Sequence, residues 1–121
     1  MEDQLLYGDL TYNIRRCIFN VHNRIGVGFD EETYHQGLIR KFKEKGMTIP
    51  VHYFDELIRT YKMRHFLIEN KIICGISALQ NTITHHDIST IKSYLQALKL
   101  KIGLAINFGK SKLEIKGVRG N

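Results

Sequence analysis

The chain has 121 residues, which is enough for a modest hydrophobic core, and we expect a single domain over residues 1–121. A hydrophobic fraction of 43% and a charged fraction of 25% are ordinary for a soluble globular protein and argue against a low-complexity chain. The formal net charge of +6 favours polyanions by long-range attraction, although a mildly basic surface explains the charge equally well.

The N-terminus and the cysteines indicate the cellular compartment. The first seven residues, MEDQLLY, lack the basic region and the long apolar run of a signal peptide. No segment approaches the roughly 20 apolar residues that a membrane helix needs, so we expect no membrane partner. Cys17 and Cys74 lie far apart in a helix-like and a strand-like run, which indicates buried thiols and not a structural zinc site. Together these features predict a cytoplasmic protein.

Two helices are predicted in the N-terminal third. The first, over residues 11–24, has apolar residues at the spacing of one helical face, and Asp9 or Thr11 can cap it. A glycine break at residues 26–28 separates it from a second helix of about 15 residues, for which Asp30 is a natural N-cap and Gly46 a terminator. The apolar stripe of this second helix is Tyr34, Leu38 and Phe42.

Strand patterns follow. Residues 47–53 alternate between apolar and polar types, and Pro50 places this strand at a sheet edge or at a strand start. A turn at Asp55-Glu56 leads into a short run at residues 57–61. The runs Met63–Ile68 and Ile72–Leu79 then flank a polar break at residues 69–71, which predicts a hairpin.

The register of this hairpin separates two faces. A three-residue loop places Ile68 opposite Ile72, Phe66 opposite Cys74 and His65 opposite Gly75. One face can then form core, through Phe66, Ile68, Ile72, Cys74 and Ile76. His65, Gly75 and Ser77 share the other face, whose role is the functional question.

The C-terminal third predicts one helix and two strands. Residues 81–86 are polar and loop-like, and Asp87 can cap a helix whose buried stripe is Ile88, Ile91, Leu95 and Leu98. An apolar strand at Ile102–Asn107, a turn at residues 108–110 and an alternating strand at residues 112–116 follow. The order α-α-β-β-β-β-α-β-β predicts an α/β (α+β) fold with a mixed central sheet flanked by helices.

An ordered set of motifs carries a family resemblance. Gly28–Tyr34 matches G-x-x-E-x-x-Y, with Gly28, Glu31 and Tyr34 at the fixed positions. Further matches are Tyr94-Leu95, Gly103-Leu104, Ile106-Asn107-Phe108-Gly109 and Leu113-Glu114-Ile115-Lys116. Over residues 6–116 the chain resembles the GxxExxY protein family, which is placed in the PD-(D/E)XK nuclease-like superfamily.

The resemblance implies a restriction-endonuclease-like fold and a metal-dependent site. In the superfamily, a helix acid, a strand Asp and a Glu-x-Lys pair on the next strand converge on Mg²⁺ or a similar ion. Hard cations prefer carboxylate oxygens, and the ion polarises the scissile phosphate and activates water. The lysine stabilises the charge that develops on the phosphate.

The chain departs from this pattern at the residues that carry the chemistry. Glu31 matches the helix acid, but His65 occupies the position of the Asp. Gly75 and Ser77 replace the Glu and the Lys of the pair, and Thr90 replaces a glutamine often found on the following helix. The core-facing neighbours stay apolar, so the resemblance implies a retained scaffold that has lost most of its catalytic residues.

Other roles compete with catalysis at each of these positions. Glu31 as a metal ligand lacks its partners, so we favour its role as an acidic residue in the first turn of a helix. One histidine with one glutamate makes a thin metal site, so we expect His65 to be a structural or surface residue. Ser77 has no identifiable base. Tyr34 and Tyr94 are expected to pack in the core with solvated hydroxyl groups.

Two further clusters are candidates. His85-His86-Asp87 offers metal ligands, but adjacent loop residues seldom converge on one ion, and Asp87 is explained as a helix cap. Lys110, Lys112, Lys116 and Arg119 form a basic C-terminal stretch that could contact nucleic acid, and a solvated strand face explains them equally well.

Three functions are compatible with the sequence. The first is a catalytically degenerate nuclease-like domain that is no enzyme, needs no cofactor, and binds DNA or RNA by non-specific electrostatics or acts through a protein partner. The second is an active nuclease that uses Mg²⁺ or Mn²⁺ in a rearranged site built from Glu31, His65 and Glu69, or from His85–Asp87. The third is a homo-oligomeric scaffold.

Overall fold

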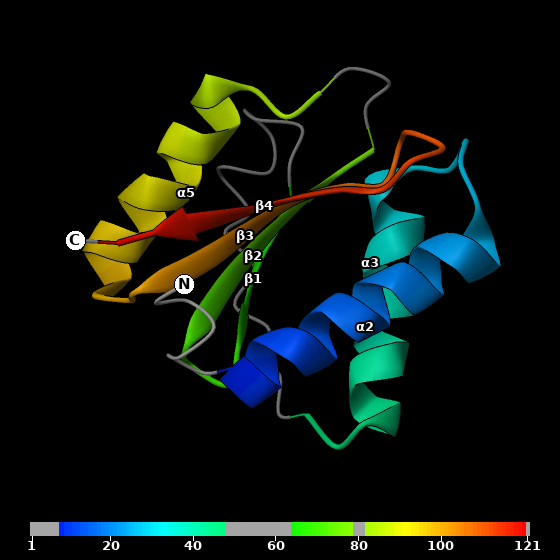
Figure 1. The fold of residues 1–121 in the computed structure, drawn as a ribbon, viewed down its shortest axis with the longest axis horizontal. Helices are drawn as coiled ribbons and strands as arrows, with labels where there is room; N and C mark the ends of the chain where they lie inside the picture. Colours follow the sequence, from blue (N-terminus) through cyan, green and yellow to red (C-terminus); the bar gives the residue numbers. More distant parts are fainter. Residues whose placement is uncertain (1–7, 48–63, 79–81, 121) are drawn as a thin grey trace.

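The computed structural model describes residues 8–47, 64–78 and 82–120 (Figure 1). In these residues three helices and four strands follow the order α-α-β-β-α-β-β, which confirms the α+β class with a mixed sheet. The two strands expected within residues 47–61 lie almost wholly outside the described residues. No described helix is long and apolar enough to cross a membrane.

The first helix, α2, spans Gly8–Ile25 and therefore begins earlier than the apolar pattern predicts. Asp9 and Thr11 lie inside it, so the expectation that either residue caps the helix is wrong. Asp9 lies in the first turn, where a negative charge complements the positive end of the helix dipole, and Thr11 is buried.

The second helix, α3, spans Glu31–Glu44 and begins as predicted. The backbone N–H and the hydroxyl of Thr33 donate to Asp30 Oδ1 at 3.0 and 2.8 Å, which confirms Asp30 as the N-cap. Gly26 and Gly28 have φ values of 80° and 96°, which side chains rarely tolerate, so glycines allow the sharp turn between the helices.

The predicted hairpin is confirmed residue by residue. Strand β1 spans Arg64–Ile68, strand β2 spans Ile72–Ser77, and the register pairs His65 with Gly75 and Ile68 with Ile72. Lys71 N–H donates to Ile68 O at 3.0 Å, and the two residues between them have φ values of 54° and 55°. This is the geometry of a type I′ turn, whose twist suits a hairpin.

The third helix, α5, spans His85–Leu98 and begins before the predicted position. Thr84, and not Asp87, is its N-cap: Thr84 Oγ1 accepts from the Asp87 N–H at 3.1 Å, while Asp87 Oδ2 accepts from the Thr84 N–H at 3.0 Å. This reciprocal capping box satisfies two donors at the helix end and places His85 and His86 in the first turn, not in a loop. Leu98 is 37% exposed, so the buried stripe ends at Leu95.

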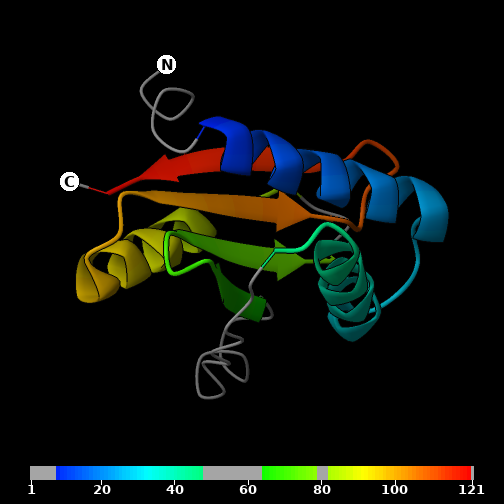
Figure 2. The same cartoon turned by 90° about the horizontal axis from the view of Figure 1, so that it is seen from below.

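The strand order is β1-β2-β3-β4. Strand β3, Ile102–Asn107, runs parallel to β2, and β4, Glu114–Arg119, runs antiparallel to β3 (Figure 2). Helix α5 forms the crossover between the parallel strands β2 and β3, as such a connection requires.

Helices cover both faces of the sheet (Figure 1). Under α2 and α3 lies the larger core cluster, which contains all five core-facing residues that the alternation predicts: Phe66, Ile68, Ile72, Cys74 and Ile76. Both cysteines are buried, as expected. Under α5 lies a smaller cluster that includes Leu67, Ile73, Ile91, Leu95 and Val118. The candidate residues of the hairpin therefore face α5.

Candidate functional site

The register places His65, Gly75 and Ser77 on the sheet face beneath α5. His65 pairs with Gly75, which pairs with Ala105 of β3, and Ser77 pairs with Asn107 at the end of the same strand. Successive side chains alternate between faces, so these residues share a face with Leu67 and Ile73, which pack against α5.

His65 is enclosed at this position. Its side chain is 1% exposed, and its ring centroid lies 4.6 Å from that of Tyr94 on α5, with 43° between the ring planes. Tyr94 is itself 6% exposed, with a buried hydroxyl group. His65 is thus a structural histidine and not a surface one. The position to which the resemblance assigns the metal-binding Asp holds an aromatic pair.

Gly75 and Ser77 offer little to a metal ion or a substrate. Gly75 has no side chain and is buried within β2. Ser77 is 2% exposed, and its hydroxyl donates to Ile106 O at 3.3 Å. Its backbone carbonyl accepts from the Phe108 N–H at 2.9 Å. Both bonds join β2 to the segment of β3, so the contacts of Ser77 are those of a structural residue.

Glu31 is the first residue of α3, which packs on the opposite face of the sheet. The Tyr34 ring stacks on Phe108 with centroids 4.6 Å apart and 5° between planes. The Phe108 N–H is hydrogen-bonded to the carbonyl of Ser77, so this stack brings the start of α3 to the end of the sheet where β2 and β3 terminate. Glu31 and Ser77 therefore approach the same end from different layers, while His65 and Gly75 lie further along the sheet.

The motif residues around Glu31 stabilise this arrangement. Gly28 adopts the positive φ that the turn before α3 requires. Tyr34 is fully buried, and its hydroxyl donates to Gly26 O at 2.6 Å. Core packing of Tyr34 and Tyr94 is confirmed, but the expected solvation of their hydroxyl groups is wrong, because both lie in the protein interior.

The other predicted ligands do not converge. His85 and His86 are exposed in the first turn of α5, where Asp87 is part of the capping box, and Glu69 lies in the hairpin turn. Within residues 8–47, 64–78 and 82–120, no group of three or more His, Cys, Asp or Glu side chains could hold a metal ion. A hard cation needs several oxygen ligands, so the side chains in these three described ranges do not fit Mg²⁺. Thr90 occupies the position at which the resemblance expects a glutamine, and its hydroxyl donates a hydrogen bond to His86 O at 2.9 Å.

Glu114 is the acid whose role the sequence analysis missed. It forms a Glu-x-Lys pair with Lys116 on β4, but both carboxylate oxygens accept bonds from the segment before α5: one from the Thr82 hydroxyl, the other from the Ile83 N–H at 3.0 Å. Burial raises the pKa of Glu114, but these two bonds, with Lys110 and Lys116 nearby, outweigh it and hold the pKa below its ordinary value. The contact spans some thirty residues and has no local sequence signal.

The basic C-terminal stretch does not form one surface. Lys110 Nζ and Lys116 Nζ lie 4.0 and 3.8 Å from the carboxylate of Glu114, which offsets part of their charge. Lys112 is exposed in the β3–β4 connection. Arg119 ends β4 and, by strand alternation, projects from the opposite face to Lys116.

A comparison with protein-family models identifies a family that the chain matches. The model described as the PD-(D/E)XK nuclease superfamily matches residues 8–118, which is nearly the whole chain and includes every described helix and nearly all of β4. Searches of the curated proteins and of the solved structures return no match.

Proposed function

The chain belongs to the PD-(D/E)XK nuclease superfamily, and from that premise we propose that it is a catalytically degenerate nuclease-like domain that binds nucleic acid without cleaving it. The observation that carries this proposal is the buried His65–Tyr94 pair, which occupies the position of the metal-binding Asp.

Electrostatics supports the loss of metal binding. A cluster of carboxylates is stable in a folded protein when a cation offsets their mutual repulsion, and Mg²⁺ gives up its hydration shell only for several oxygen ligands. His65, Gly75 and Ser77 are uncharged or weakly basic, so they can lie beneath α5 without a cation. Glu31 is the single matched acid, and one carboxylate competes poorly with water for Mg²⁺.

Within the superfamily, we assign the chain to the GxxExxY proteins. The support is physical: the pattern requires a glycine where φ is 96°, and a tyrosine that bonds to the preceding turn and stacks on Phe108 of the later Asn-Phe-Gly motif. Tyr34 of the first motif thus contacts Phe108 of the later motif, which supports the assignment.

Nucleic-acid binding rests on charge. The net charge of +6 attracts a polyanion, and contacts between lysine and phosphate carry no sequence information. We therefore propose binding that is weak in sequence preference and open to DNA and RNA, in a cytoplasmic setting. The logarithm of the affinity should fall steeply with the logarithm of the salt concentration, and strong discrimination between sequences would contradict the proposal.

Calorimetric titration with Mn²⁺ tests the proposed degeneracy. The wild-type chain should show no binding that depends on Glu31, so wild type and Glu31→Ala should give the same titration. The variant His65→Asp, Gly75→Glu, Ser77→Lys restores the pattern, and Mn²⁺ should stabilise it against unfolding. Mn²⁺ binding by the wild type that Glu31→Ala abolishes would reject the proposal, whether or not the restored variant folds.

A further inference from the structure

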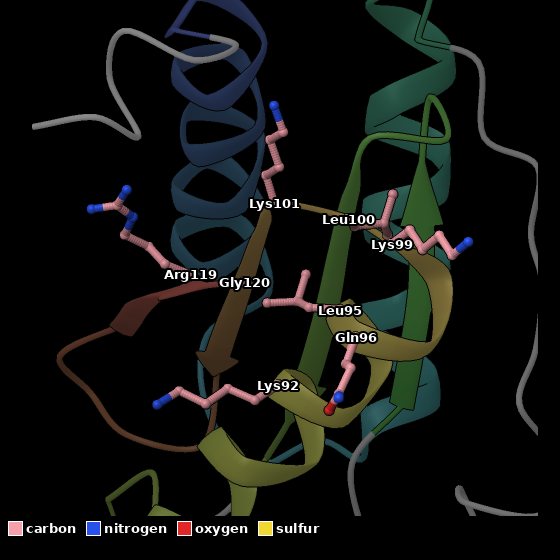
Figure 3. Close-up of a pocket in the computed structure, with 8 residues that line it drawn as sticks. All are labelled: Lys92, Leu95, Gln96, Lys99, Leu100, Lys101, Arg119 and Gly120. Carbon is pink, nitrogen blue, oxygen red and sulfur yellow. The ribbon is translucent and has the colours of Figure 1, made fainter.

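A depression of about 500 Å³ lies at the C-terminal end of α5 (Figure 3). Leu95 and Leu100 are its apolar lining. Four cationic side chains surround it: Lys92 from α5, Lys99 and Lys101 from the connection to β3, and Arg119 from the end of β4.

Backbone hydrogen bonds fix the frame from which these side chains extend. Lys99 ends α5 in the left-handed conformation with φ of 57°, and the Leu100 N–H donates to Leu95 O at 2.9 Å. The Gly120 N–H donates to Lys101 O at 2.8 Å, which ties the end of β4 to the start of β3. A Cβ at Gly120 would lie 2.4 Å from Leu100 O, so the two segments meet in backbone contact.

The charge of the three lysines at the depression is not offset by a carboxylate that lines it. No Asp or Glu lines it, and Lys92, Lys99 and Lys101 form no ion pair with any carboxylate in the described parts of the chain. The C-terminal end of a helix carries roughly half a negative charge, which one lysine more than balances. The remaining cations attract an anion, in contrast to Lys110 and Lys116, which lie near Glu114.

The directions of the side chains define the kind of anion. Figure 3 shows the four cationic ends pointing away from one another around the rim, so they do not converge on one small ion. A chain of phosphates that passes over the depression can contact these side chains one after another. Lysine ammonium groups act as point charges in this way when they neutralise the phosphates of a nucleic-acid backbone.

We propose that this depression is where the phosphodiester backbone of a nucleic acid docks, an inference that rests on the proposed nucleic-acid binding. The depression lies at the end of the sheet where β3 begins and β4 ends, whereas Ser77 lies at the other end of β2 and β3. Docking here is independent of His65, Gly75 and Ser77, so the chain retains binding although the catalytic pattern is lost.

Fluorescence anisotropy with a labelled DNA duplex of random sequence, at about 50 to about 200 mM salt, tests this site. The variant Lys92→Gln, Lys99→Gln, Lys101→Gln should bind at least about tenfold more weakly than wild type, and its salt slope should be shallower by about 2 to 3. The control Lys43→Gln, Lys45→Gln, Lys71→Gln removes the same charge at exposed lysines outside the depression and should lose less than about threefold in affinity. Circular dichroism confirms that both variants fold.

The outcomes separate the two proposals. If the wild type binds neither DNA nor RNA at about 50 mM salt, nucleic-acid binding itself is wrong. If the wild type binds and the two variants weaken equally, binding reflects net charge and the docking site is wrong. Displacement of DNA by inorganic phosphate, beyond the effect of sulfate at equal ionic strength, would indicate a single-phosphate pocket and overturn the docking site. Lysine-dependent binding to phosphatidylserine vesicles, without binding to oligonucleotides, would overturn it in favour of a membrane surface.

Discussion

Single residues determine what the face beneath α5 can do. A charged side chain that is removed from water without a partner destabilises the fold, whereas a neutral imidazole beside an aromatic ring is tolerated. His65 is 1% exposed, and its ring lies against that of Tyr94. Under the proposed degeneracy, a His in place of the family's Asp lets this position pack against an aromatic ring without a metal ion.

Replacing His65 by Asp alone should destabilise the protein. We expect His65→Asp to lower the free energy of unfolding by about 2 to 4 kcal/mol at pH 7, because a buried carboxylate loses its hydration and the contact with Tyr94 is lost. The loss should shrink near pH 4, since burial raises the pKa of the new carboxyl group and the neutral form is easier to bury. Urea denaturation at both pH values measures this, with His65→Gln as the neutral control. Equal losses for the two variants at both pH values would show that the site is open to water.

Glu114 should make stability depend on pH. Its folded-state pKa is lowered, so its contribution is present above the unfolded pKa near 4.3 and is lost as the pH falls through the folded value. Glu114→Gln should therefore cost about 1 to 3 kcal/mol at pH 7, because hydrogen bonds to Thr82 and Ile83 weaken, and clearly less near pH 3. Urea denaturation across this pH range measures the free energy of unfolding of the wild type and of the variant. A cost that does not change with pH would contradict the ionised role of Glu114.

At the scale of helices and strands, patterns among neighbouring residues predict the features that neighbouring residues determine, such as a hairpin register or the start of a helix. The alternation around residues 69–71 gives the hairpin and its register, and Asp30 with the glycine break gives the start of α3. The start of α5 is mispredicted because Asp87 is read as the cap, although it is the third residue of a Thr-x-x-Asp capping box. The contact of Glu114 with the segment before α5 is not predictable in this way, since it depends on the assembled sheet.

The cap of α5 can be tested directly. Thr84→Ala should lower the free energy of unfolding by about 1 kcal/mol, because the N–H of Asp87 loses its acceptor. Thr84→Ser retains the acceptor and is the matched control, with a loss of no more than a few tenths of a kcal/mol. Thermal and urea denaturation measure these differences. No cost for Thr84→Ala would indicate that Asp87 caps the helix alone.

At the scale of the whole molecule, the two ends of the sheet separate two features of the surface. The end of β2 and the start of α3 carry Ser77 and Glu31, the proposed remnant of the nuclease pattern, and the end of α5 with Arg119 carries the basic depression. The remnant could be located from the sequence, because its residues follow a strand alternation and a family pattern. The depression could not, since Lys92 lies on α5, Lys101 in the connection to β3 and Arg119 at the end of β4, and only the fold brings these segments together.

A cleavage assay on the wild-type chain measures most directly whether its nuclease-like site is degenerate. Labelled DNA and RNA, single- and double-stranded, are incubated with Mg²⁺ and in parallel with Mn²⁺, at protein concentrations that saturate binding. Under the proposed degeneracy the substrates should stay as intact as in an EDTA control, because Glu31 is the one acid that the family resemblance matches in the metal-binding pattern. Metal-dependent cleavage that Glu31→Ala abolishes would contradict the proposed degeneracy and show that the site has been rebuilt around Glu31.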